Sequence, residues 1–445
     1  MAPKYYSEKM ECLLHVTALL ILLLSAVEST GDIIHSNFDT TSAHWNDTNG
    51  DRIEAHAAGM LYSKTDSYWY WYGESKKTNS LSTHGVNCYR STSLAGPWEF
   101  VGQVLSQNDI SVKDLPPPYV IERPKVLFNE MTKKFVMWFH LDDSKYKYRH
   151  SGVATSVKPE GPFHFEYALQ PDGIPSLDMN LWRDPLDNKA YFIRSCDNQY
   201  AGISEMTNDY MNTTGLISKH DRFEGMALFR LKNGTVYLIA SHLTGWNPNP
   251  LMLFRNDGAS MTESAWTLLG NPTHQAQSFN TQPTYVVSQN DQNGNEYFIY
   301  LSDNWINDGG LINAGYVWLP FWFEQDAVVL KKQSAWNLKH PFLTMANTSI
   351  STSTVKNASP QRVIVDTDMG FDVDDVVAVC LANSLHMNSK INLLAVVHNT
   401  GCNLGIGGVS SINHWYNHDN VTLGAWKGMC FCRQILFHIP CTLKW

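Results

Sequence analysis

The chain has 445 residues, of which 43% are apolar and 12% aromatic, and its formal net charge is −9. This apolar content is sufficient for a sizeable core, and the length predicts more than one domain. The negative charge argues against nucleic acid or an anionic membrane surface as a partner.

Residues 1–30 have the order of a secretory signal peptide. Lys4 and Lys9 precede a mostly apolar run from Leu13 to Ala26, which small and polar residues follow. That run is too short to cross a bilayer of about 30 Å comfortably. We therefore expect cleavage after Ala26 and a secreted protein with no stable membrane association; an uncleaved anchor is the alternative.

Five stretches of the chain repeat one pattern, in which a carboxylate or amide leads an apolar strand, a polar turn and an aromatic-rich strand. The leading residues lie 46 to 68 positions apart, and they are Glu54, Glu122, Asp178, Glu224 and Gln282. Repeats of about 40 to 50 residues made only of strands are typical of β-propellers. We predict an all-β, five-bladed β-propeller over residues 31–330. Since the first strand of each blade lines the axis, the five leading side chains should converge at one mouth of the central channel.

Two features of the chain suit a secreted protein. The repeats contain two cysteines, Cys88 and Cys196. They either form a disulfide or remain free thiols, and both alternatives stay open because a sequence does not supply the geometry that a disulfide needs. Asparagines in Asn-x-Ser/Thr sequences are candidate glycan sites, which makes a glycoprotein an expectation. These are Asn46, Asn212, Asn233, Asn347, Asn357 and Asn420.

The pattern changes after the repeats. Residues 331–361 are rich in Ser, Thr, Asn and Lys, which predicts an exposed linker. Residues 362–428 contain a short buried strand, an Asp-rich turn, an apolar helix and a second strand from Ile391 to Val397. This order predicts a truncated α/β segment with parallel strands. Residues 429–445 show no usable periodicity, and we expect an irregular tail.

A ring of carboxyl groups on one axis suits glycosidic bond hydrolysis. That reaction needs one protonated carboxyl near the leaving oxygen and a second group that handles water or acts as nucleophile. A neighbouring carboxylate raises the pKa of the acid and keeps it protonated.

Residues 32–325 resemble glycoside hydrolase family 43. The resemblance lies in the five-bladed pattern and in several motifs. These are Glu224-Gly225, Asp187-Asn188-Lys189-Ala190-Tyr191 and the stretch from Tyr68 to Glu74. Three further motifs are most similar to the exo-β-1,3-galactanase subgroup. They are Ile53-Glu54-Ala55-His56, Glu122-Arg123-Pro124-Lys125 and Thr281-Gln282-Pro283-Thr284.

The resemblance implies an inverting, exo-acting enzyme that releases galactose from β-1,3-galactan. It implies that Glu224 is the general acid, and that Asp178 raises the pKa of Glu224 and orients its side chain. The sequence has no Asp-Pro pair on the first blade, where the family carries its base. Two alternatives remain: Gln282 positions the attacking water, or Glu54 takes its proton. The rival functions are an arabinofuranosidase or xylosidase of the same family, and a sugar-binding propeller without catalysis.

Several residues near the leading positions are candidates for binding an oligosaccharide or polysaccharide. Glu122, Arg123 and His56 would bind sugar hydroxyls, with salt bridges inside the propeller as the alternative for the last two. Trp182, Trp246 and Trp305 are candidates for stacking on galactose, although each also suits the core. We expect no cofactor for this reaction.

The Asp-rich turn and the sequence from His398 to Gly401 resemble the amino-terminal part of an inosine-uridine-preferring nucleoside hydrolase. The resemblance implies that Asp368, Asp374, Asp375 and Asn399 hold calcium and ribose, with Asp368 activating water. Carboxylate oxygens are the ligands that calcium prefers. The family's later ligands lie beyond the point where this sequence ends, so we expect a vestigial calcium site in a truncated segment. An acidic turn that caps a helix is the alternative.

Overall fold

The chain forms two compact units, Met1–Met345 and Ala346–Trp445. Among the described residues, no helix has the length and apolar character needed to cross a membrane. The computed structural model describes residues 32–38, 45–78, 80–113, 115–245, 247, 249–261, 265–305, 311–324, 327–342, 361–367, 374–387, 391–398, 403–416, 418 and 420–425.

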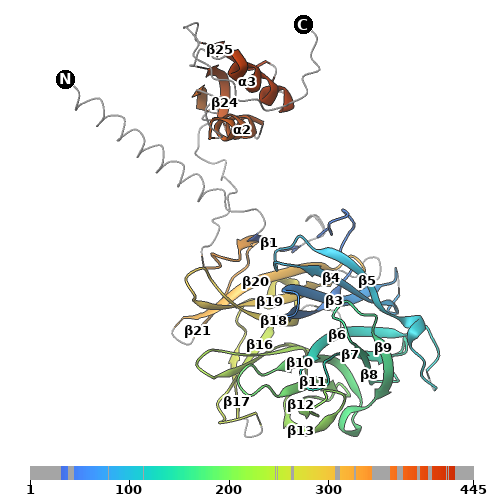
Figure 1. Ribbon diagram of the computed structural model, residues 1–445. Helices are drawn as coiled ribbons and strands as arrows, with labels where there is room; N and C mark the ends of the chain where they lie inside the picture. Colours follow the sequence, from blue (N-terminus) through green and yellow to red (C-terminus); the bar gives the residue numbers. More distant parts are fainter. Residues whose placement is uncertain are drawn as a thin grey trace. The chain divides into compact units, whose positions relative to one another are not determined.

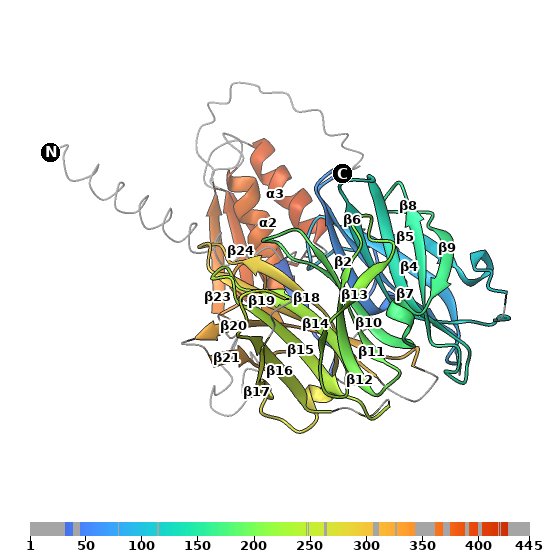
Figure 2. The ribbon, with the colours of Figure 1, turned by 90° about the horizontal axis from the view of Figure 1, so that it is seen from below.

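The first unit is a five-bladed β-propeller, which confirms the predicted fold class (Figure 1). Each blade is a four-stranded antiparallel sheet whose strands follow chain order from the inner to the outer edge (Figure 2). The first three blades are β2 (His56–Ser63), β3 (Tyr68–Lys76), β4 (Thr83–Ser91) and β5 (Glu99–Ser106); β6 (Val120–Asn129), β7 (Lys134–Asp142), β8 (His150–Ser156) and β9 (His164–Leu169); and β10 (Ser176–Arg183), β11 (Ala190–Cys196), β12 (Tyr200–Met206) and β13 (Thr213–Lys219). The last two are β14 (Phe223–Arg230), β15 (Val236–His242), β16 (Leu251–Asn256) and β17 (Trp266–Gly270); and β18 (Gln282–Asn290), β19 (Glu296–Asn304), β20 (Gly315–Glu324) and β21 (Ala327–Leu330). Short 3₁₀ helices lie in the connections, at η2 (Gln107–Asp109), η3 (Pro171–Gly173) and η4 (Ser278–Asn280).

The ring of blades closes on itself. The inner strands contact one another in the order β2, β6, β10, β14 and β18, and β18 also contacts β2. A separate two-stranded sheet joins the ends of the propeller, because β1 (Ile33–His35) pairs with β22 (Ala335–Asn337). Trp336 in β22 is fully buried, and its indole N–H donates to the carbonyl oxygen of Trp318 at 2.7 Å. Residues 331–342, which we expected to begin an exposed linker, therefore belong to the propeller unit.

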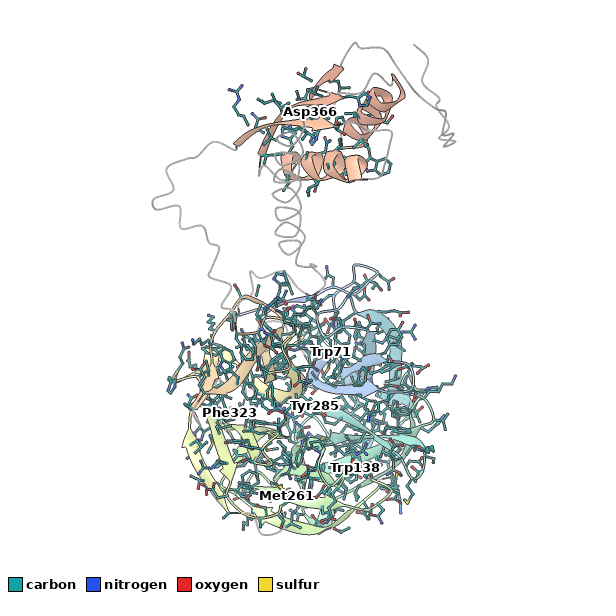
Figure 3. The ribbon with its side chains drawn as sticks, turned by 60° about the vertical axis from the view of Figure 1, so that its left-hand side comes forward. Trp71, Trp138, Met261, Tyr285, Phe323 and Asp366 are labelled. Atoms are coloured by element: carbon teal, nitrogen blue, oxygen red, sulfur yellow. The ribbon has the colours of Figure 1, made fainter. Side chains whose placement is uncertain are left out.

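Aromatic side chains fill the space between neighbouring blades. Trp71 is fully buried and packs edge-on against Tyr316 of the last blade, with ring centroids 4.7 Å apart. Trp138 packs at a tilt against Phe192 of the next blade, with ring centroids 4.9 Å apart. Figure 3 shows Trp71 and Trp138 in their blades, with Tyr285 near the centre of the ring. Most of the aromatic residues thus serve the core rather than a ligand.

Cys88 and Cys196 do not form a disulfide. Both are free, buried thiols. Burial raises the pKa of each thiol, so neither is a reactive thiolate near neutral pH.

The second unit has the predicted parallel α/β order (Figure 1). Its sheet holds β23 (Gln361–Thr367), β24 (Ile391–His398) and β25 (Thr422–Ala425) side by side and parallel. Helices α2 (Asp374–Met387) and α3 (Asn403–Trp415) connect them. Val379, Val396 and Val409 are fully buried between the helices and the sheet.

Candidate active site

Each inner strand carries a β-bulge at the same point near its beginning. In the second blade Glu122 pairs with His140, but Lys125 pairs with Trp138, so that two residues of β6 face one of β7. Corresponding breaks occur in β2, β10, β14 and β18. A bulge bends its strand and redirects the side chains beside it. The repeated bulge therefore explains why these strands turn side chains toward one mouth of the channel.

The bulges correct the predicted alignment of the five leading residues. Counting back from the first regular pair after each bulge places His56, Glu122, Ser176, Glu224 and Gln282 at equivalent positions. Glu54 lies two residues before its expected position and Asp178 two residues after. The prediction of a common position was therefore wrong for these two residues, because the place of an acidic residue in the sequence does not reveal the pairing register of its strand.

Asp178 nevertheless joins a network with residues of three other blades. Its Oδ2 lies 2.8 Å from Nε of Arg123 and accepts from the backbone N–H of Gly225 at 3.1 Å. The Arg123 guanidinium is almost fully buried and also donates through Nη2 to Oε1 of Gln282 at 2.5 Å. Trp305 donates its indole N–H to the same oxygen at 2.9 Å. The structure thus brings together four of the predicted site residues.

Glu224 is the carboxyl group in this site that favours the protonated form. Burial raises its pKa to about 9, with the charge of Asp178 acting in the same direction and Arg123 opposing them. Its Oε1 is buried without a hydrogen-bond partner. A carboxyl group of this kind holds its proton at neutral pH and has it available for transfer.

Glu122 has the opposite character. Burial alone would raise its pKa, but Lys76 and the hydrogen bonds from His140 and Tyr146 lower it to about 2. Nδ1 of His140 lies 3.0 Å from Glu122, and its Nε2 lies 2.9 Å from Asp142. Because both ring nitrogens face carboxylates, His140 is an imidazolium, and these carboxylates raise its pKa to about 9 against the effect of burial. Glu122 is therefore a fixed negative charge.

Polar residues on the second strands, which the sequence pattern did not reveal as part of the site, lie opposite the beginnings of the first strands. Glu74 accepts from the backbone N–H of Arg123 at 2.8 Å and lies 2.5 Å from Nζ of Lys76. Asp303, opposite Gln282, is fully buried and accepts from the backbone N–H of Ala57 at 2.6 Å. Burial raises the pKa of Asp303 to about 6, although His56 opposes this shift. The available signal was that each of these carboxylates ends an aromatic run, where antiparallel pairing sets it beside the residue just before the bulge of the first strand, His56 or Gln282.

Glu54 and His56 form a pair at the edge of this cluster. Oε2 of Glu54 lies 3.3 Å from Nε2 of His56, and its Oε1 lies 3.3 Å from Nε of Arg52. The His56 side chain is fully buried, with its ring 5.9 Å from that of Trp305. We expected His56 to bind a sugar hydroxyl, with a salt bridge inside the propeller as the alternative. Its burial and its contact with Glu54 favour the alternative.

The three predicted stacking residues have different outcomes. Trp305 lies in the site and lines a small pocket together with Gln282 and Thr281. Trp246 lies outside the described residues. Trp182 is four residues beyond Asp178 on β10, about 13 Å along the strand, and it is buried against Tyr191. The stacking role of Trp182 at this site is therefore wrong.

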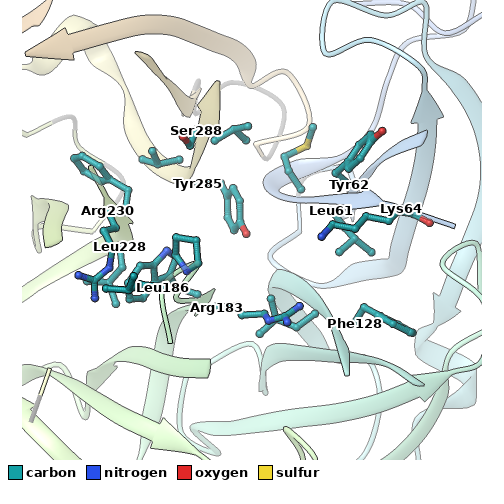
Figure 4. Close-up of a pocket in the computed structure, with 18 of the residues that line it drawn as sticks. Leu61, Tyr62, Lys64, Phe128, Arg183, Leu186, Leu228, Arg230, Tyr285 and Ser288 are labelled. Atoms are coloured by element: carbon teal, nitrogen blue, oxygen red, sulfur yellow. The ribbon is translucent and has the colours of Figure 1, made fainter. Parts of the chain in front are cut away.

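Trp182 instead lines a larger cavity of about 1120 Å³, built from the far ends of the inner strands. Figure 4 shows Tyr285 projecting into this space, with Leu61 and Tyr62 on one side and Leu228 and Arg230 on another. Its carboxylates are Glu130, which forms an exposed pair with Lys133 at 3.2 Å, and Glu296, which accepts from the backbone N–H of Lys232 at 3.0 Å. The chemistry of acid catalysis thus lies at the mouth with the bulges, although the other mouth is wider.

The predicted calcium site cannot be compared with the structure. Asp368 and Asn399 lie outside the described residues, and so do the side chains of Asp374 and Asp375 at the start of α2. Within the described part of the chain, no cluster of three or more His, Cys, Asp or Glu side chains is arranged to hold a metal ion. The calcium site stays a prediction.

Comparison with known proteins places this site in a family. No protein-family model matches the chain, and no curated protein matches its sequence. Solved structures do match it. An exo-β-1,3-galactanase from Clostridium thermocellum shares 31% identity over 69% of this chain and 67% of its own, with a TM-score of 0.62.

Two further solved structures agree with this match. The exo-β-1,3-galactanase from Phanerochaete chrysosporium with galactose is 31% identical over 68% of each chain, with a TM-score of 0.60. A family GH43 β-1,3-galactosidase with galactodeoxynojirimycin is 30% identical over 68% of this chain and 100% of its own, with a TM-score of 0.61. The chain belongs to glycoside hydrolase family 43 and is a glycosidase, an enzyme that hydrolyses O-glycosyl bonds.

Proposed function

We propose that this chain is a secreted, inverting, exo-acting enzyme that removes galactose from β-1,3-galactan. The observation that carries the proposal is the protonated Glu224 beside Asp178 and Arg123, in a site whose solved relatives act on this linkage. One of them, the Phanerochaete chrysosporium enzyme, has been solved in variant form with β-1,3-galactotriose, and it is 29% identical to this chain with a TM-score of 0.61.

The proposed reaction assigns a separate task to each group. Glu224 gives its proton to the glycosidic oxygen as the bond from that oxygen to the anomeric carbon breaks. Asp178 keeps this proton on Glu224 until the sugar arrives, because a second negative charge there is unfavourable. Water attacks the anomeric carbon from the opposite face, which inverts the configuration. Its proton passes to a base, for which Glu54 and Gln282 are the candidates.

The substrate is held by charge and by an aromatic surface. Glu122 stays ionised, so it accepts hydrogen bonds from sugar hydroxyls. Trp305, fixed by its bond to Gln282, offers an aromatic face to the apolar side of galactose. The protein groups so assigned supply acid catalysis and binding without a cofactor.

A sugar-binding propeller without catalysis remains the second candidate. One observation favours it: the first blade presents His56, not a carboxylate, at the position equivalent to Glu122 and Glu224. Binding of β-1,3-galactobiose measured by calorimetry, without release of galactose, would select this alternative.

Product analysis after incubation with β-1,3-galactan tests the proposal. We expect galactose as the sole early product, released first as the α-anomer, which NMR detects directly. Glu224→Gln should lower turnover by about 10²- to 10⁴-fold, the usual contribution of a general acid. Glu130→Gln, the same chemical change at the exposed opposite mouth, is the control and should leave turnover unchanged. Arabinose or xylose released from a panel of chromogenic glycosides, with no galactose from galactan, would indicate the other activities of the family.

Two further proposals concern the ends of the chain. We propose that residues 1–30 direct secretion, which amino-terminal sequencing of the protein recovered from culture medium would test. We also propose that residues 362–428 are a remnant of a nucleoside hydrolase without activity of its own. Calcium-dependent release of hypoxanthine from inosine by the full chain would contradict this.

A further inference from the structure

The mouth opposite the candidate active site holds a cavity of about 1120 Å³ that the proposed reaction does not use. All five blades contribute to its wall, through the far ends of their inner strands and the turns that follow. Phe128 lines it from β6, six residues beyond Glu122 and therefore about 20 Å along the strand. Sites for small molecules usually measure about 300–1,000 Å³. The cavity is thus a separate space with room for a ligand of several rings.

Two cations of the cavity wall are neutralised by neighbouring carboxylates. Lys133 lies 3.2 Å from Glu130, and Arg230 forms an ion pair with Asp184, which is fully buried. The four charges cancel in pairs. They therefore add little to the net charge that a ligand in the cavity would meet.

Three other lining cations have no ion-pair partner among the residues that the structure describes. They are Lys64, Arg183 and Lys232, and the remaining carboxylate of the wall is Glu296. Arg183 donates through Nη2 to the neutral side chain of Asn188 at 2.9 Å, while its Nε is buried without a hydrogen-bond partner. Three cations against one carboxylate make this mouth positive, in a chain whose net charge is −9.

The polar groups of the cavity that lack a partner are mainly hydrogen-bond donors. Figure 4 shows Tyr285, Lys64 and Arg183 around one open space. Within the described part of the chain, the hydroxyl of Tyr285 has no hydrogen-bond partner. Ammonium and guanidinium groups donate hydrogen bonds and cannot accept them. A carboxylate fits these donors best, because it only accepts and because a guanidinium can bind both of its oxygens.

Aromatic side chains form part of the rim of the cavity. Tyr62 is 44% exposed and lies at a tilt to the half-buried Trp69, with ring centroids 5.1 Å apart. An exposed aromatic face can pack against the C–H face of a sugar ring. A long alkyl chain would instead need a continuous apolar surface, whereas Ser63 and Lys64 follow Tyr62 directly on this wall. The rim therefore suits a sugar better than a fatty acid.

We infer that this second mouth binds an acidic oligosaccharide, with a uronate carboxylate held by Arg183 and Lys64 and a sugar ring packed on Tyr62. The chain is a glycosidase, so saccharides are the ligands that it meets. No bond is made or broken at this site. The inference does not depend on the linkage cleaved at the mouth with the bulges, because binding is measured without turnover.

Calorimetry with the full chain tests the inference with four probes: α-1,4-trigalacturonate, the neutral α-1,4-galactotriose, galacturonic acid and laurate. We expect one trigalacturonate to bind per chain, and added salt should weaken this binding. The neutral trimer should bind at least about 10-fold more weakly, since it lacks the charge-assisted bonds. Galacturonic acid should also bind more weakly than the trimer, because a single ring makes fewer contacts. Trigalacturonate should not inhibit the hydrolysis of an aryl β-galactoside.

Single substitutions locate the bound trigalacturonate. Arg183→Met, which keeps the alkyl part of the side chain, should lower the affinity about 10- to 100-fold. Lys64 is exposed, so Lys64→Ala should lower it only about 2- to 5-fold, and Tyr62→Ala about 2- to 10-fold. Lys158→Ala is the matched control, since Lys158 is also exposed but lies outside the cavity wall, and its affinity should be unchanged.

Several results would overturn the inference. They are no binding of trigalacturonate, equal affinity for the neutral trimer, competitive inhibition of aryl galactoside hydrolysis, or unchanged affinity in Arg183→Met. If Arg183→Met does not fold, the double variant Lys64→Ala/Tyr62→Ala changes only exposed side chains, and it should lose about 10-fold in affinity; no loss would refute the site. Tighter binding of laurate or of galacturonic acid would contradict an oligosaccharide site. Failure of the galactan proposal would appear as no galactose released from β-1,3-galactan, and the binding results would still be readable.

Discussion

Gly225 offers a demanding test of the site, because its lack of a side chain allows two neighbouring blades to approach each other closely. Its φ is +60°, a conformation that favours glycine, and a Cβ added there would lie 2.9 Å from Cγ of Gln282 and 3.2 Å from Cδ of Pro283. The backbone N–H of Gly225 also donates to Asp178. Gly225→Ala should therefore displace Gln282 and disturb Asp178 together.

The magnitude follows from these contacts. Left-handed backbone strain costs about 1–2 kcal/mol for a residue with a Cβ, and loss of the charge-assisted bond from Arg123 to Gln282 costs about 1.5–3 kcal/mol. We expect the free energy of unfolding to fall by about 3 kcal/mol. Turnover should fall by about 10²-fold, the effect of a displacement of roughly 1 Å in an active site.

Gly234→Ala is the matched control. Gly234 also has a positive φ, of +95°, but no atom lies within 4 Å of an added Cβ. This variant should show only the backbone cost of a Cβ at positive φ, about 1–2 kcal/mol in denaturant unfolding, with unchanged kcat on the aryl galactoside. If Gly225→Ala keeps wild-type kcat, or if Gly234→Ala loses as much activity, the reasoning from the blade contact is refuted.

Three further predictions use other parts of the structure. Because Glu224 must be protonated and its pKa is about 9, kcat should fall as the pH rises through about 9. Asp178→Asn removes a charge that raises this pKa, so the alkaline fall of kcat should move to lower pH in this variant. An unchanged pH profile would contradict the effect of Asp178 on Glu224. His140→Ala leaves the carboxylates of Glu122 and Asp142 buried without their shared cation, which should lower the free energy of unfolding by about 3–5 kcal/mol. His84 is exposed, and His84→Ala should change this free energy by less than about 0.5 kcal/mol. Equal stabilities of the two variants in urea unfolding would show that His140 is not a charged bridge. Removal of divalent metals with EDTA should leave the rate of galactose release unchanged, since the residues assigned to the reaction are not arranged as a metal site, and a loss restored by calcium would refute this.

Much of the fold could be predicted because it depends on local patterns. The alternation of apolar strands and polar turns predicted the five blades, and the strand–helix–strand order predicted the parallel sheet of the second unit. The role of β22 was missed, because it depends on pairing with β1, about 300 residues away in the chain. A single Trp336 in a polar stretch did not reveal that pairing.

The candidate site was predictable in part. Glu224, Asp178, Arg123, Gln282 and Trp305 lie together, as the repeated pattern and the family resemblance implied. The bulges were not predictable, since they insert one residue without altering the apolar pattern. The pairing register, which the sequence does not show, places His56 rather than Glu54 at the position equivalent to Glu122. Glu74, Asp303 and His140 were missed because their role comes from the strand opposite. Trp182 was misplaced for a simpler reason: a strand carries side chains to both ends of a channel, and distance from the leading residue decides which end.

Infrared difference spectroscopy tests the central claim most directly, because it reports the protonation of a single carboxyl group. The wild-type spectrum minus that of Glu224→Gln at pH 7 should contain the C=O band of a protonated carboxylic acid, and this band should disappear as the pH rises through about 9. A carboxylate band at pH 7 in its place would mean that Glu224 is already ionised, and the proposed proton donor would be excluded.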